Sequence, residues 1–158
     1  MVDLSLDTLM NLIDKFPDNI MGIKHNYLLL LSNLTLTSFL DTDLFMNNIK
    51  KISAMGAIYI LYKSVPSKED FTIVASGTII VEPKIFREGK NVGHIEDIVV
   101  SQTMQHKGLC KIILNSLKTY ARENNCYKVI LECKNELKPI YKKNGFQVKG
   151  VQMAEYFV

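Results

Sequence analysis

Residues 93–111 combine the residue types and the order of elements that can hold an anion. The apolar run ends at Val100, a polar loop follows, and Gly108 opens an amphipathic segment. Where a strand and loop give way to a helix, backbone N–H groups can crowd around an anion, and the helix dipole adds about half an elementary charge of attraction. The pattern indicates a pyrophosphate cradle at residues 105–110. The open alternative is that Gly108 only makes the turn.

Three carboxylates belong to two apolar segments. Glu96 and Asp97 lie within one such segment, and Glu132 ends the next one along the chain. A carboxylate that is partly removed from water by buried strands needs a partner for its charge, whereas a carboxylate on the surface is solvated. A cation or a sugar hydroxyl is a suitable partner. The alternative, open above all for Asp97, is pairing with a structural lysine.

The elements that must position these residues follow from hydrophobic periodicity and from turn and cap residues. We expect helices at about residues 4–13, 25–36, 41–52 (capped by Asp41 or Thr42), 108–123 and 137–143, the last ended by Gly145 in a left-handed conformation. We expect strands at about residues 57–62, 71–82, 92–100 and 128–133, and one or two more within 146–157.

The order of these elements predicts an α/β fold. A polar turn at 64–70 joins the first two strands into an antiparallel hairpin, whereas the crossover helix at 108–123 indicates a parallel pair. The prediction is a mixed central sheet, antiparallel in its first half and flanked by helices. A length of 158 residues fits one domain, 1–158.

Composition narrows the function classes. Apolar residues make up 47% of the chain and charged residues 22%, as in an ordinary globular protein. A net charge of +3 is too small for a nucleic-acid footprint, so small phosphorylated partners fit better. The longest apolar run is too short for a bilayer, and the histidines at 25, 94 and 106 lack metal-ligand spacing, so we expect neither a membrane span nor a metal.

Cysteine usage indicates the compartment. Cys110, Cys126 and Cys133 are odd in number and have no framework spacing, and the first nine residues lack a secretion signal pattern. We therefore expect a reducing cytoplasm.

Taken together, the motifs of this chain resemble those of a known superfamily. Glu96-Asp97-Ile98-Val99-Val100, Leu131-Glu132-Cys133 and Ile140-Tyr141-Lys142-Lys143-Asn144-Gly145-Phe146 flank the Gly108 loop in that order. The chain thereby resembles the GCN5-related N-acetyltransferase (GNAT) superfamily and, within it, the glucosamine-6-phosphate N-acetyltransferase family. It departs from the family pattern at Cys110, at Leu137, where an asparagine is usual, and at Glu155, near which the family has an arginine.

The resemblance implies a GNAT fold with a splayed centre and transfer of acetyl from acetyl-CoA to the amine of glucosamine 6-phosphate, within UDP-N-acetylglucosamine biosynthesis. It implies cofactor contacts at Asp97, Ile98, Val99, Val100, Gln105, His106, Lys107, Gly108, Leu109, Cys110, Tyr141 and Lys143. It implies acceptor contacts at Thr37, Lys84, Arg87, Glu96, Asp97, Glu132 and Cys133. The implied catalytic groups are Tyr141, Glu132 and the backbone N–H near Ile98, which faces the thioester oxygen from a bulge.

Tyr141 is the predicted proton donor to the departing thiolate. A phenol with a pKa near 10 stays protonated at neutral pH. The alternative is that Tyr141 only packs in the core. Cys133 has no histidine partner in its sequence context, so we expect direct attack by the amine rather than an acyl-cysteine.

Other readings of the chain stay open. The acceptor could be a peptide, a polyamine or another aminosugar, and the chain could be an inactive regulatory domain that binds acyl-CoA. A Walker or Rossmann nucleotide module is disfavoured because its glycine pattern is absent. The resemblance also implies a homodimer, in which the alternating segment 147–153 exchanges with the partner.

Overall fold

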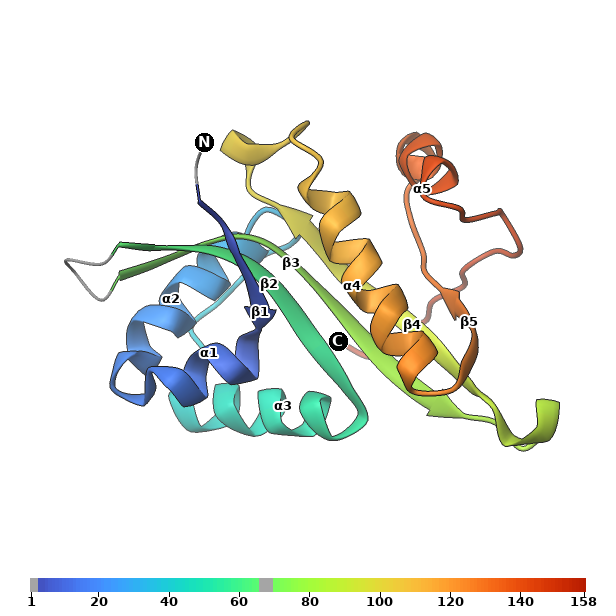
Figure 1. The fold of residues 1–158 in the computed structure, drawn as a ribbon, viewed down its shortest axis with the longest axis horizontal. Helices are drawn as coiled ribbons and strands as arrows, with labels where there is room; N and C mark the ends of the chain where they lie inside the picture. Colours follow the sequence, from blue (N-terminus) through green and yellow to red (C-terminus); the bar gives the residue numbers. More distant parts are fainter. Residues whose placement is uncertain (1–2, 66–69) are drawn as a thin grey trace.

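A five-stranded mixed sheet forms the centre of the described chain (Figure 1). The structure is a computed structural model and describes residues 3–65 and 70–158. The strands, in sheet order, are β1 Ser5–Thr8, β2 Gly56–Val65, β3 Asp70–Pro83, β4 Asn91–Val100 and β5 Cys126–Ile130. The first four pair antiparallel and β5 pairs parallel with β4, which confirms the predicted α/β class. Residues 66–69 of the predicted turn lie outside the described residues.

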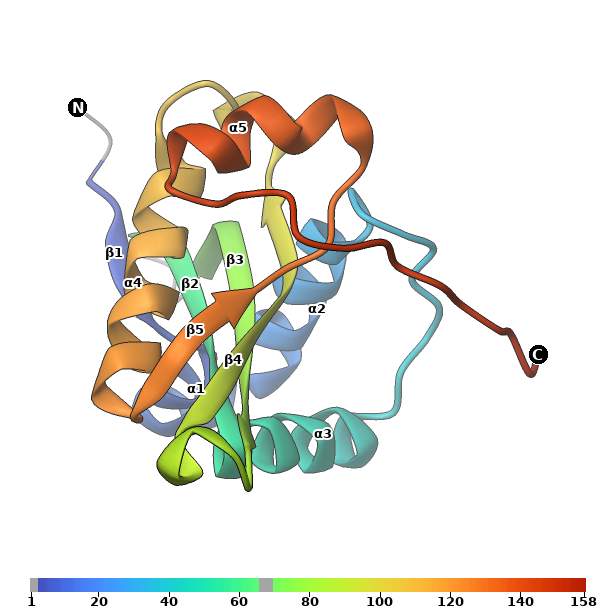
Figure 2. The ribbon, with the colours of Figure 1, turned by 90° about the vertical axis from the view of Figure 1, so that its right-hand side faces the viewer.

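Helices cover both faces of the sheet (Figure 2). They are α1 Leu9–Lys15, α2 Ile20–Leu31, α3 Thr42–Met55, α4 Leu109–Glu123 and α5 Lys138–Lys143. The first three pack on one face, α4 packs on the other, and α5 lies past the end of β5. Within the described ranges, no helix is long and apolar enough to span a bilayer.

Alternate side chains of β2 pack into two hydrophobic cores, one on each face of the sheet. Ile58 and Ile60 pack with α1–α3, whereas Ala57 and Leu61 pack with α4. This follows from the period of two in a strand. Ile113, Leu114 and Leu117 of α4 are fully buried, and each such side chain contributes roughly 1.5–3 kcal/mol by leaving water. That burial fixes α4, and with it the loop that precedes the helix.

Local signals predicted α3 well and α2 only in part. Asp41 caps α3 by accepting hydrogen bonds from the amides of Asp43 and Leu44, at 2.9 and 3.2 Å. The α2 helix is shifted toward the N-terminus and ends at Leu31 rather than near residue 36. Its end is stabilised where Ser32 Oγ donates to Leu29 O, at 2.6 Å.

The predicted opening helix is wrong in its first half. Ser5–Thr8 forms β1, which pairs antiparallel with residues 59–62 of β2, and the helix begins only at Leu9. Thr8 caps it by accepting a hydrogen bond from Asn11 N at 3.1 Å. Pairing with a distant edge strand outweighed the local helical pattern, as tertiary contacts often do.

The predicted C-terminal strands are absent from the described residues 146–158, and β5 stops at Ile130 rather than at Cys133. A strand needs a neighbour for its backbone hydrogen bonds, and this tail pairs with none of the five strands. Val151, Met153 and Phe157 are each about nine-tenths exposed. The tail crosses from α5 toward the side of α2 and α3 as an extended segment (Figure 2).

Candidate active site

β4 carries a bulge at the predicted position. Asp97 and Ile98 together stand opposite Gly77 of β3, and Asp97 has a left-handed φ of 52°. A bulge leaves its extra residue outside the ladder of backbone hydrogen bonds and bends the strand. Gly77 makes room for it, since a Cβ there would lie 2.5 Å from Ile98 Cδ1 and 2.6 Å from Ile113 Cγ2.

The two parallel strands stop pairing just beyond this point. Their last pair is His94 with Ile130, and Glu96 and Glu132 each follow two residues later. The two carboxylates lie near enough at this divergence for their charges to interact. Burial raises the pKa of Glu96, and the negative charges of Asp97 and Glu132 raise it further. Such a cluster suits an ammonium group or an amine that must lose a proton.

The loop before α4 presents a row of free backbone donors. The amides of residues 105–111 donate to no other described residue, and the first amide of this region with a partner is that of Ile112, which donates to Gly108 O at 3.3 Å. His106 and Gly108 have φ of 61° and 79°. Left-handed residues alternating with ordinary ones turn successive N–H groups to one side. Buried Leu109 anchors the helix, so the loop can hold a diphosphate at its N-terminus.

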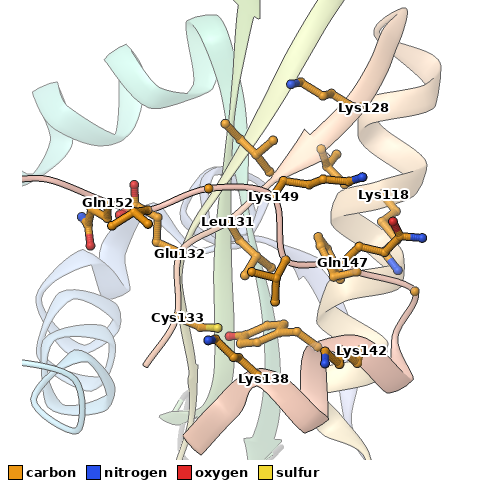
Figure 3. Close-up of a pocket in the computed structure, with 18 residues that line it drawn as sticks. Lys118, Lys128, Leu131, Glu132, Cys133, Lys138, Lys142, Gln147, Lys149 and Gln152 are labelled. Carbon is orange, nitrogen blue, oxygen red and sulfur yellow. The ribbon is translucent and has the colours of Figure 1, made fainter. Parts of the chain in front are cut away.

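Tyr141 opens onto a pocket of about 690 Å³ that Glu132 and Cys133 also line (Figure 3). The Tyr141 ring is buried and meets Phe146 edge-on at 5.9 Å between centroids. Among the described residues its hydroxyl has no hydrogen-bond partner. Burial, and next the neighbouring Cys110 and Cys133, raise the pKa of Tyr141 to about 12. The phenol is therefore protonated at neutral pH and free to donate.

Comparison with known proteins shows which family this chain belongs to. The model of the acetyltransferase (GNAT) family matches residues 41–146. The chain belongs to this family. A glucosamine 6-phosphate N-acetyltransferase of Candida albicans is 37% identical over 130 residues, covering 82% of this chain and 86% of that one. The glucosamine 6-phosphate N-acetyltransferase 1 of Oryza sativa is 33% identical over 141 residues, covering 89% and 85%.

Solved structures agree with the GNAT fold. The crystal structure of glucosamine-6-phosphate N-acetyltransferase from Arabidopsis thaliana superposes with a TM-score of 0.82 and 28% identity, covering 99% of both chains. An acetyltransferase from Trypanosoma brucei superposes equally well, at 29% identity. The predicted splayed, mixed sheet is thereby confirmed.

The GNAT domain does not bring all the predicted acceptor residues together within one chain. Lys84 pairs with Glu82, and Arg87 lies over the Tyr127 ring, 5.5 Å from its centroid. Both belong to the turn before β4, at the opposite end of that strand from the bulge (Figure 1). At about 3.3 Å per residue, the bulge is roughly 20 Å further on.

The remaining predicted site residues differ in whether they can contact a ligand. Val99 is buried in the core, so only its backbone can meet a ligand. Thr37 lies exposed in the connection between α2 and α3, and Lys143 lies exposed at the end of α5. Neither lines the pocket around Tyr141. Within the described chain, no three His, Cys, Asp or Glu side chains are grouped to hold a metal.

The lysines that line the pocket were not among the predicted site residues. They are Lys118, Lys128, Lys138, Lys142 and Lys149. The sequence did contain a signal for this basic cluster. Residues 105–158 contain ten basic and four acidic side chains, whereas residues 1–104 contain nine basic and twelve acidic side chains. The small net charge of the whole chain concealed this asymmetry.

The raised pKa of Glu96 predicts a shift in the pH profile. If ionised Glu96 accepts the amine proton, kcat/KM falls at acid pH as this carboxyl becomes protonated. Glu132→Gln removes a negative charge that raises the pKa of Glu96, so the acid limb should move to lower pH. Profiles of log kcat/KM against pH measure this, with Glu136→Gln as the control. An unmoved acid limb in Glu132→Gln excludes Glu96 as the titrating group.

Proposed function

We propose that this GNAT domain transfers the acetyl group of acetyl-CoA to the amino group of D-glucosamine 6-phosphate, giving N-acetyl-D-glucosamine 6-phosphate and CoA. The observation that carries the proposal is a loop of unpartnered amides directly after the strand whose carboxylates suit an amine. Relatives that align with most of the chain are named for this reaction. In this proposal residues 1–158 act as one domain.

The donor is held by backbone groups. The amides of residues 105–110 and the positive end of α4 bind its diphosphate. The backbone of residues 97–100 receives the pantetheine arm as it would an added strand. The N–H near Ile98 donates to the thioester oxygen, where negative charge develops during attack.

The acceptor is held by carboxylates. Glu96 and Glu132 receive the ammonium group, and Asp97, Cys133 and Thr37 complete the acceptor contacts. Glu96 takes the proton that frees the nitrogen lone pair. The amine nitrogen then attacks the carbonyl carbon, the C–N bond forms, the C–S bond breaks, and its electron pair leaves on the CoA sulfur.

Tyr141 stabilises the departing thiolate. A phenol with a pKa of about 12 is a weaker acid than a thiol, whose ordinary pKa is about 8.5. Complete proton transfer is therefore uphill in this environment. Tyr141 acts by donating a hydrogen bond to the sulfur as charge develops there.

We propose that the enzyme is a homodimer. The exposed apolar side chains of the tail, among them Met153, Tyr156 and Phe157, suit a contact with a second copy. The position of Lys84 and Arg87 agrees with a dimer, because within one chain they lie at the end of β4 away from the carboxylates. Light scattering of the purified chain tests this, and a monomer at micromolar concentration would contradict it.

The proposed setting is the cytoplasm, in the synthesis of UDP-N-acetylglucosamine. The free thiols Cys110, Cys126 and Cys133 suit a reducing compartment.

An acceptor panel tests the function. The purified chain is incubated with acetyl-CoA and glucosamine 6-phosphate, glucosamine, a polyamine or a peptide with a free N-terminus, and thiol release is followed. We expect the highest kcat/KM with glucosamine 6-phosphate. Preference for another amine would reassign the acceptor, and acetyl-CoA binding without thiol release for any amine would indicate a regulatory domain.

A further inference from the structure

Lys24 is a buried lysine that the proposed reaction does not use. It belongs to α2, and only 6% of its surface is exposed. Its ammonium group donates hydrogen bonds to Leu40 O and to Thr42 Oγ1, each at 2.9 Å. The same group lies 5.4 Å from the centroid of the Phe39 ring. All three partners lie where the connection between α2 and α3 ends and α3 begins.

This ammonium group has no acidic partner. Among the described residues, no carboxylate pairs with Lys24. Taking a positive charge out of water costs free energy, and neutral acceptors and an aromatic ring compensate for it less than a carboxylate does. A methionine would fill a similar space without that cost. What the lysine adds is a pair of directed hydrogen bonds that fix the end of the connection relative to α2.

The connection, residues 32–41, has few other polar ties. It runs along the outside of the domain from α2 to α3 (Figure 2). Its first residues continue from α2 by backbone hydrogen bonds, two of them to Leu31 O. Residues 36–39 form no hydrogen bond with any part of the chain that the structure describes. The second half of the connection is therefore tied to α2 by Lys24.

We propose that Lys24 is a positioning residue, which holds the α2–α3 connection in the conformation that binds the acceptor. The inference rests on the proposed function, in which Thr37 of this connection contacts the aminosugar. Three residues of extended chain span at most about 10 Å, so the carbonyl of Leu40 limits where Thr37 can lie. A connection that is already ordered loses less conformational entropy when the acceptor binds, which lowers KM for the acceptor.

The first test is Lys24→Met, which nearly keeps the length of the side chain and removes its donors. We expect KM for glucosamine 6-phosphate to rise about five-fold or more and KM for acetyl-CoA to change less than about two-fold. Thr8→Ala is the matched control, because it removes the cap of α1 and lowers stability away from the connection. It should leave both KM values unchanged.

The second test needs no turnover. Chymotrypsin cleaves after large apolar residues, and Leu36 and Phe39 of the connection are 100% and 89% exposed. We expect the connection of Lys24→Met to be cut about five-fold faster than that of the wild type, because cleavage needs a segment that can leave its folded conformation. The masses of the fragments locate the cut.

A milder variant covers the case in which Lys24→Met does not fold. Thr42→Val removes one of the two acceptors at a partly exposed position and leaves Leu40 O in place. It should raise KM for glucosamine 6-phosphate and the rate of cleavage in the same direction as Lys24→Met, by a smaller factor.

Three outcomes overturn the proposal: an unchanged KM for the acceptor, equal rises in KM for acceptor and donor, or an unchanged rate of cleavage within the connection. If the wild-type chain does not acetylate glucosamine 6-phosphate, the proposed function fails by itself. The cleavage rates of Lys24→Met, Thr42→Val and Thr8→Ala then still show whether Lys24 holds the connection, and KM for the amine that the acceptor panel identifies replaces that for glucosamine 6-phosphate.

Discussion

Tyr141→Phe should lower kcat by about ten-fold or more while KM for acetyl-CoA stays nearly unchanged. The substitution keeps the ring, which packs edge-on against Phe146, and removes a hydroxyl that has no hydrogen-bond partner in the described structure. Because no folded-state hydrogen bond is lost, stability should hold. The substitution removes a hydrogen-bond donor that is needed only when negative charge forms on the CoA sulfur. A ten-fold loss in kcat corresponds to about 1.4 kcal/mol of transition-state stabilisation.

A matched control is available in α4. Tyr120→Phe also deletes a phenol hydroxyl, here one that donates to Gly56 O at 3.1 Å. It should cost about 1 kcal/mol of stability and leave kcat near the wild-type value. Steady-state kinetics and thermal melts of both variants separate the two effects. Wild-type kcat in Tyr141→Phe would remove this residue from the mechanism and return it to a packing role.

Gly56→Ala should destabilise the fold by about 3 kcal/mol or more, which lowers Tm by roughly 6–12 °C. Gly56 ends α3 and starts β2, where it pairs with Ile80. A Cβ at this position would lie 1.8 Å from the carbonyl oxygen of Ile79. The obstacle is backbone rather than a flexible side chain, so β2 and β3 must separate to relieve it.

Gly22→Ala provides the contrast for this prediction. Gly22 lies in α2, and a Cβ there would meet nothing within 4 Å. Alanine in a helix is favoured over glycine by about 1 kcal/mol, so stability should hold or rise. Calorimetry of both variants gives the comparison. Similar Tm values for Gly56→Ala and the wild type would show that the two strands can part at little cost.

Elements that depend on residues close in sequence were predicted more accurately than elements that depend on distant residues. The cap at Asp41, the left-handed Gly145 and the helix at 109–123 depend on residues close in sequence, and all were predicted. The bulge near Ile98 was inferred from resemblance to a family, since a backbone irregularity has no side-chain signature. The roles of the amide loop, the carboxylates and Tyr141 stay predictions, and the lysines that line the pocket beside Tyr141 were not predicted.

The sequence by itself determined which residues can do chemistry and, through local periodicity, most of the elements that carry them. Tertiary structure decided that residues 5–8 pair with β2 and that the tail pairs with no strand. It also decided that Glu96 lies near Glu132. Each of these depends on distances between residues far apart along the chain. Pairing, burial and the Coulomb energy vary with those distances, which no local pattern encodes.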